Sequence, residues 1–184
     1  MGRKKSQNDG EAKQIPKNRL PVVRMATFDT SREIMLKYPG EPKAMQSFKV
    51  ALMGKHIHKY QPTGNVEWKN YIRILTLQQL PDGFKPFPAG MPLRVESRFY
   101  FQIPASFPKR LRAGIEAGTA IAYHVSKPDL SDNLKKGLND ALNGIVWEDD
   151  RLIAIEYGSK EYSKEPRIEV VITPLVYVDP SEMD

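Results

Sequence analysis

A helical pattern enclosed by two strand-like patterns is the feature that most limits how this sequence can fold. The expected helix covers residues 133–143, with strand-like residues 119–125 before it and 151–157 after it. Four apolar residues recur on one face of that helix, at spacings of three and four: Leu134, Leu138, Ala141 and Leu142. Such a helix buries its apolar face against a sheet, so we expect layers of helices and strands.

Other segments indicate the same fold class. Three more segments have the composition of strands: residues 47–53, 93–103 and 167–172. A helix over residues 65–77 places four apolar side chains on one face: Trp68, Tyr71, Ile72 and Leu75. We also expect a short helix over residues 30–37, a loop rich in Pro and Gly over residues 80–92, and a basic loop or short helix near residue 110. This order predicts a single small α/β (α+β) domain with a mixed sheet.

Charge divides the chain into three parts. Residues 1–24 contain seven Lys or Arg against two acids, a net charge of +5, and residues 174–184 contain three acids and no base. We therefore expect a basic, largely flexible arm over residues 1–45, a folded domain over residues 46–173 and an acidic C-terminal tail. Because the whole chain carries +6, only +4 remains between the two ends. Binding of nucleic acid by the domain would have to use local basic patches.

Composition excludes several classes of protein. A chain of 184 residues is long enough for one domain and short for two. It contains no cysteine, which excludes disulfides and thiolate-bound zinc, so any metal has to be held by oxygen or histidine. No apolar run approaches the roughly 20 residues of a membrane span, and the polar N-terminus lacks the apolar stretch of a secretory signal. We therefore expect a cytoplasmic protein.

Charged residues gather around the expected helix of residues 133–143. Five acids and one lysine lie in or beside it: Asp129, Asp132, Lys136, Asp140, Asp149 and Asp150. Asp132 stands at the N-cap position, and Lys136 and Asp140 follow it at intervals of four along one edge. If packing against the flanking strands brings the carboxylates together, they form a pocket that selects Mg²⁺ or Mn²⁺. The alternative is an ordinary solvated helix followed by an acidic turn.

These residues belong to a longer ordered pattern. It reads His124-Val125-Ser126-Lys127-Pro128-Asp129, then Asp132-Asn133-Leu134 and Lys136, then Asp140-Ala141-Leu142-Asn143-Gly144, and finally Trp147 with Asp149-Asp150. The pattern resembles the signature of RusA-type Holliday-junction resolvases, and the resemblance extends over about residues 46–173. The family spaces its first two aspartates by one residue, whereas here Leu130 and Ser131 separate Asp129 from Asp132.

The resemblance implies a small mixed-sheet endonuclease that acts as a homodimer on branched DNA. By motif position, the family's metal-binding and catalytic aspartates fall on Asp129, Asp132 and Asp150, and its catalytic lysine falls on Lys136. Asp149 is an alternative to Asp150, because adjacent strand residues point to opposite faces. The implied ion is Mg²⁺, with Mn²⁺ as an alternative. The implied reaction is resolution of a Holliday junction by paired symmetric nicks that leave 5′-phosphate and 3′-hydroxyl ends, in recombination and repair, by a bacterial or phage-encoded enzyme.

Five basic residues are candidates for contacts with the DNA backbone: Lys55, Lys59, Lys109, Arg110 and Arg112. Ordinary solvated loop charge is the competing interpretation for each of them. His56 and His58 are interpreted as surface residues rather than metal ligands. Two other functions stay open. One is a protein of the same fold that binds branched DNA without cutting it, and the other is a metal-dependent enzyme acting on small phosphate esters, against which the basic arm counts.

Overall fold

The structure, a computed structural model, describes residues 25–45, 49–53, 56–60 and 62–178. At its centre, the long strand β7 (Arg167–Val178) pairs antiparallel with three others. β5 (Leu93–Gln102) lies along one edge of β7, while β1 (Met25–Phe28) and β2 (Ile34–Pro39) follow one another along the opposite edge. β6 (Ile153–Ser163) pairs in parallel with β5 and forms the outer edge of the sheet. This mixed sheet confirms the predicted fold class.

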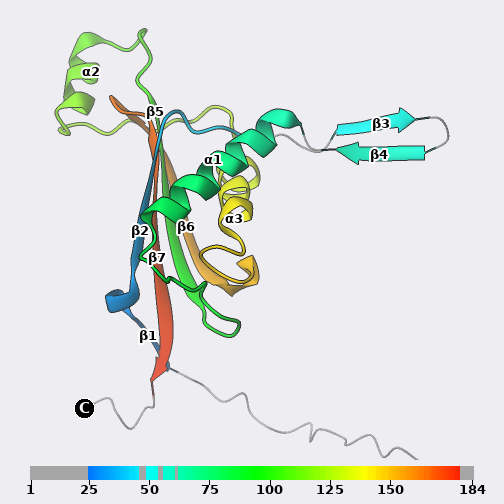
Figure 1. Cartoon of the computed structure of the whole chain (residues 1–184). Helices are drawn as coiled ribbons and strands as arrows, with labels where there is room; N and C mark the ends of the chain where they lie inside the picture. Colours follow the sequence, from blue (N-terminus) through cyan, green and yellow to red (C-terminus); the bar gives the residue numbers. More distant parts are fainter. Residues whose placement is uncertain (1–24, 46–48, 54–55, 61, 179–184) are drawn as a thin grey trace, which may run out of the picture.

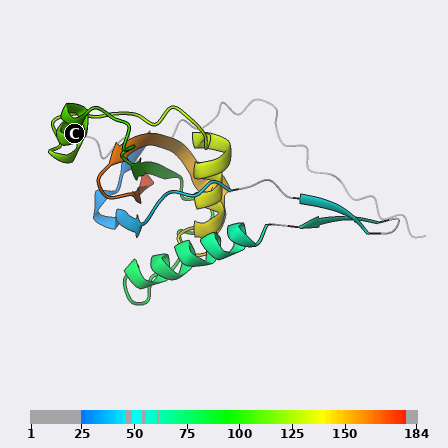
Figure 2. The ribbon, with the colours of Figure 1, turned by 90° about the horizontal axis from the view of Figure 1, so that it is seen from above.

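The parallel pairing of β5 with β6 requires a long crossover. Residues 103–152 provide it, and they contain four helical elements: α2 (Lys109–Glu116), the π-helical turn η2 (Leu130–Lys135), α3 (Lys136–Leu142) and the 3₁₀ turn η3 (Asp150–Leu152). All the acidic candidate residues lie in this crossover. A separate hairpin of β3 (Lys49–Met53) and β4 (His56–Tyr60) projects away from the sheet (Figures 1 and 2).

Two helices cover one face of the sheet. α1 (Thr63–Gln79) and α3 pack against each other, as Figure 2 shows from above, and their buried side chains share one core with those of β5. The core between them contains most of the apolar residues predicted for the two helices: Trp68, Ile72, Leu134, Leu138, Ala141 and Leu142. Leu75 is partly buried against this core, whereas Tyr71 was predicted on the same face and is 40% exposed. Among the described residues, no helix has both the length and the apolar character needed to cross a bilayer.

The start of the domain differs from the prediction. Residues 30–37 were expected to be a helix, but only the short turn η1 (Thr30–Arg32) is helical, and β2 follows it. Leu36 and Tyr38 alternate with exposed residues and are buried, and all six residues of β2 pair with β7. Pairing with β7, between 128 and 138 residues later in the sequence, outweighs the local preference for a helix. Residues 25–39 therefore belong to the sheet rather than to a flexible arm, and β7 extends to Val178, into the expected tail.

Residues 119–125 are a second correction. They were expected to form a strand, but they make only one isolated bridge, between Tyr123 and Glu161 on the outer edge of β6. Ile121, Tyr123 and Val125 are 68%, 63% and 92% exposed, so the apolar residues behind the prediction do not enter the core. The strand over residues 93–103, the helix over 65–77 and the loop over 80–92 are confirmed, and so is the strand expected over 47–53 from residue 49 onward, where the described residues begin. The two C-terminal strands are confirmed and longer than expected, with β5 lying between them.

Candidate active site

The first two candidate aspartates lie at the start of a π-helical turn, η2. Asp129 precedes it, and the main-chain oxygen of Asp129 accepts a hydrogen bond from the amide of Leu134, five residues later, at 3.2 Å. A π turn takes in about one residue more than an α turn, which gives a place for the extra residue between Asp129 and Asp132. Asp132 was expected to cap the helix, but the helical conformation begins before it, so Asp132 lies within the first turn. The predicted stop at Asn143-Gly144 is confirmed, with Gly144 at φ +77°.

The candidate side chains at this end of the helix face outward. Asp129, Asp132 and Lys136 are exposed, and Asp140 is half-buried. The Oδ2 atom of Asp129 accepts a hydrogen bond from Nδ2 of Asn133 at 3.3 Å, which orients its carboxylate. The two carboxylates and the lysine are each open to solvent, and so to a cation or a phosphate group.

The third candidate aspartate lies at the other end of α3. Glu156 on β6 forms an ion pair with Lys135 and accepts a hydrogen bond from Asn139. These contacts place Glu156 beside the first half of α3. Asp150 comes six residues before Glu156, and the extended residues 153–156 alone cover about 10 Å. Asp150 is exposed, and Asp149 caps η3 by accepting the amide of Arg151 at 3.0 Å.

The pocket of carboxylates expected from the sequence is therefore not formed within one chain. The residues that the structure describes contain no group of three or more His, Cys, Asp or Glu side chains able to hold a metal ion. The donor type at the start of the helix still fits a divalent ion, because Mg²⁺ commonly takes one or two carboxylates together with water and substrate phosphate. Asp129 and Asp132 fit that role, whereas Asp150 of the same chain does not.

The basic candidates lie on two separate elements. Lys109 and Arg110 are exposed at the start of α2, and Arg112 is half-buried in the same helix. Figure 1 shows α2 beyond the end of the sheet, apart from α1 and α3. Lys59 belongs to β4, opposite Val50, and His56 and His58 belong to the same strand. Lys55 lies outside the described residues.

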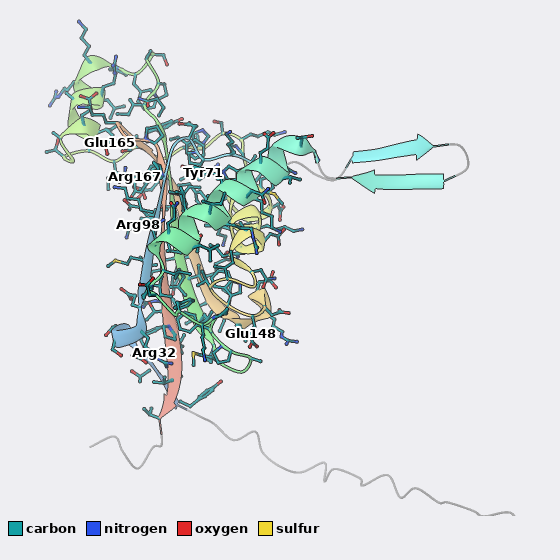
Figure 3. The ribbon with its side chains drawn as sticks, in the orientation of Figure 1. Arg32, Tyr71, Arg98, Glu148, Glu165 and Arg167 are labelled. Carbon is teal, nitrogen blue, oxygen red and sulfur yellow. The ribbon has the colours of Figure 1, made fainter. Side chains whose placement is uncertain are left out.

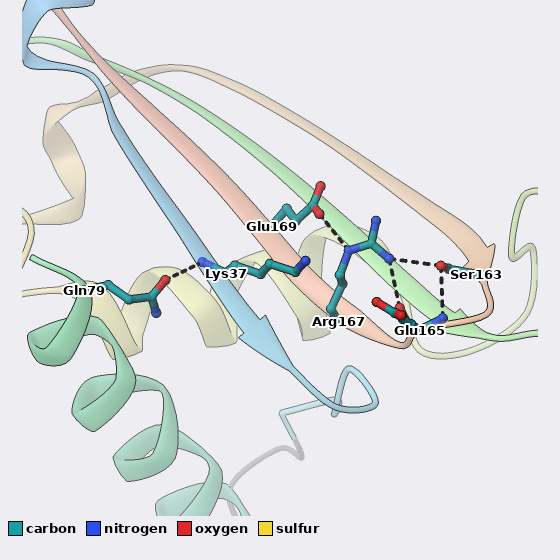
Figure 4. Close-up of polar contacts among 6 residues, drawn as sticks. All are labelled: Lys37, Gln79, Ser163, Glu165, Arg167 and Glu169. Atoms are coloured by element: carbon teal, nitrogen blue, oxygen red, sulfur yellow. Dashed lines mark hydrogen bonds and ion pairs between the residues drawn. The ribbon is translucent and has the colours of Figure 1, made fainter. Parts of the chain in front are cut away.

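The sheet face turned away from α1 and α3, here called the outer face, was not identified from the sequence. Figure 3 shows Arg98 and Arg167 on this side. Nε of Arg167 lies 2.6 Å from Oε1 of Glu169, and its guanidinium carbon lies 3.8 Å from the ring centroid of Tyr100 (Figure 4). Hydrogen bonding with Tyr100 raises the pKa of Arg98. Glu169 pairs with Arg167, and Glu161 and Glu169 both lie near Arg98, so carboxylates offset the charge of these two arginines.

Comparison with known proteins identifies a class of DNA-cleaving enzymes. The family model for the endodeoxyribonuclease RusA matches residues 39–173, which include the last residue of β2, the helical layer and the whole acidic crossover. A protein of Bacillus subtilis (strain 168), "Uncharacterized protein YqaN", is 30% identical over 133 residues, covering 72% of this chain and 90% of that protein. The chain belongs to the RusA endodeoxyribonuclease family, as its motif predicted.

Proposed function

We propose that this protein is a Mg²⁺-dependent, structure-specific endodeoxyribonuclease that resolves Holliday junctions by paired symmetric nicks. It would act in the cytoplasm, in DNA recombination and repair, with Mn²⁺ as an alternative ion. The observation that carries the proposal is the exposed group of Asp129, Asp132 and Lys136 at the start of the helical layer, inside the family match.

Each residue of this group has a distinct proposed role. Asp129 and Asp132 would hold the ion, with Asn133 orienting the carboxylate of Asp129. Lys136 opens α3 and would place its ammonium beside the phosphate that receives charge during cleavage. When bound, a divalent ion lowers the pKa of an attacking water and neutralises charge on the phosphate.

We further propose a homodimer, for two reasons. A four-way junction presents two equivalent strands, so a two-fold dimer places one site on each. The dimer also gives a place to Asp150, which its own chain holds at the far end of α3. A two-fold axis can bring Asp150 of one copy to the Asp129 and Asp132 pair of the other.

Mixing two inactive variants tests this arrangement. If sites are shared between copies, a heterodimer of Asp132→Asn with Asp150→Asn contains one site with both aspartates, and mixing restores single-strand nicking. If each site lies within one copy, every site in the mixture carries a lesion and nicking stays absent. The second result would refute the shared site, and a monomer in sedimentation analysis would refute the dimer.

Contacts with the DNA backbone are proposed for Lys55, Lys59, Lys109, Arg110 and Arg112. Their positive charge would give affinity that does not depend on base sequence. Replacing both Lys109 and Arg110 with Met should weaken junction binding and reduce its salt dependence. An unchanged salt slope would remove α2 from the DNA-binding surface.

A synthetic four-way junction tests the activity itself. We expect symmetric nicking with Mg²⁺, which EDTA stops, and we expect Asp132→Asn to abolish nicking while junction binding persists. Asp82→Asn is the matched control, since Asp82 is an exposed aspartate in the loop before β5. Wild-type protein that binds the junction with Mg²⁺ or Mn²⁺ but never nicks it would favour the alternative, a binding protein that has lost catalysis.

A further inference from the structure

Three alternate residues of β6 hold the segment that carries the aspartates. Glu156, Gly158 and Lys160 lie on one side of the strand, because side chains two residues apart share a face. Oε2 of Glu156 lies 3.0 Å from Nζ of Lys135, and its Oε1 accepts a hydrogen bond from Asn139 at 2.8 Å. This contact fixes the end of η2 and the start of α3.

Gly158 allows the segment to lie close to the strand. A Cβ atom at this position would be 3.0 Å from Cδ of Lys135 and 3.3 Å from Cδ1 of Leu130. Both contacts are tighter than ordinary van der Waals distance, so the absence of a side chain lets η2 rest directly on β6.

Lys160 holds the residues just before Asp129. Its Nζ donates to the main-chain oxygens of Ser126 and Pro128, each at 2.7 Å. Its own main-chain oxygen accepts the amide of His124 at 2.9 Å. In the described part of the chain, no carboxylate lies within ion-pair distance of this ammonium, so carbonyl groups supply the partners recorded for it.

The neighbouring residues show why these two hydrogen bonds of Lys160 matter. Before Lys127, the segment is held by one isolated bridge to β6 and by the ring of His124, which stacks on Phe101 at 4.1 Å, whereas Val125 is 92% exposed. Charge-assisted hydrogen bonds of this length are roughly twice as strong as neutral ones. Lys160 therefore fixes the chain immediately before the first candidate ligand.

We propose that Lys160 is a positioning residue, which sets the place of the Asp129 carboxylate and thereby the affinity of the site for a divalent ion. This inference rests on the proposed function. Residues that orient metal ligands typically change metal affinity about 10- to 100-fold when they are replaced.

The test measures Mn²⁺ binding without DNA, by the electron paramagnetic resonance signal of the free ion. We expect Lys160→Met to bind Mn²⁺ at least about tenfold more weakly than wild type. Lys37→Met is the matched control, because Lys37 is an exposed lysine of β2 on the outer face (Figure 4), and it should bind as wild type does. Lys160→Arg should recover part of the affinity, since a guanidinium also donates to two carbonyls.

The outcomes separate this inference from the proposed function. If wild type binds Mn²⁺ and nicks junctions, and folded Lys160→Met has the same affinity, the role of Lys160 is refuted while the nuclease stands. Wild type that binds no Mn²⁺ and cuts nothing would overturn both. If Lys160→Met fails to fold, Lys160→Gln decides, because a neutral amide cannot form charge-assisted hydrogen bonds with the two carbonyls. Wild-type Mn²⁺ affinity in folded Lys160→Gln would then refute the proposal.

Discussion

Replacing Arg73 with Met should loosen the end of α3 that leads to Asp149 and Asp150. Arg73 extends from α1, and its Nη1 donates to the main-chain oxygens of Ala141 and Asn143, each at 3.2 Å. The last carbonyls of a helix have no partner within the helix, and a cation stabilises them further. Methionine keeps the apolar stem and removes only these two bonds.

The size of the effect follows from those bonds. A hydrogen bond with a charged donor contributes about 1.5–3 kcal/mol. Both bonds share one nitrogen and are long, so we expect a loss near the low end, about 2 kcal/mol for the pair. In a domain of this size, each kcal/mol lowers the melting temperature by about 2–4 °C, which predicts a decrease of about 4–8 °C.

Calorimetry of wild type, Arg73→Met and Arg32→Met measures the effect. Arg32 serves as the control because its ion pair with Asp29 lies on the surface, where such pairs contribute little. We expect a clear decrease for Arg73→Met and almost none for Arg32→Met. Equal melting temperatures for the two variants would show that Arg73 does not support the end of α3.

Three further predictions concern the core, the pH dependence and the arm. Leu138→Ala should cost about 2–5 kcal/mol in urea unfolding, since Leu138 is fully buried, and a loss below about 1 kcal/mol would contradict that packing. The hydroxyl of Tyr38 lies 2.8 Å from Oγ1 of Thr76, and burial raises its pKa well above the ordinary value of 10.0. As pH rises, this tyrosine ionises in the unfolded chain before it ionises in the folded protein, so its contribution to stability should be fully present below pH 10 and fall above it. Tyr38→Phe should reduce this loss of stability at alkaline pH. The same pH dependence of the urea midpoint in wild type and Tyr38→Phe would refute this role of Tyr38. Removal of residues 1–19 should weaken junction binding and lower its salt dependence without ending nicking, whereas an unchanged salt slope would exclude the arm from DNA binding.

Local sequence patterns correctly predicted the two helices of the helical layer and the family to which the chain belongs. The spacing of Trp68 and Ile72, and of Leu138 and Leu142, predicted two helices with apolar faces, and the structure places both faces in one core. The family was also recognisable, because the order of aspartates, Asn133 and Lys136 is specific. These features depend on residues close together in the sequence.

The features that the sequence did not predict depend on distant partners. Residues 34–39 form a strand because β7 supplies their hydrogen bonds, and that strand lies between 128 and 138 residues later in the sequence. Asp150 was expected near Asp132 because packing of the helix against both flanking strands could bring their carboxylates together, yet residues 119–125 form no strand and the chain leads along α3, away from its start. Lys160 and Gly158 look like ordinary strand residues until the segment lying on them is known.

The long crossover has a consequence for how the protein loses activity. Fifty residues separate the end of β5 from the start of β6. These two strands can pair only when this long loop is closed, which costs conformational entropy. β6 is also an outer strand, so it can detach while β7 stays paired with β2 and β5. On warming, we expect cleavage to disappear before the rest of the sheet unfolds, because the strand that leaves first takes with it the support of both aspartates.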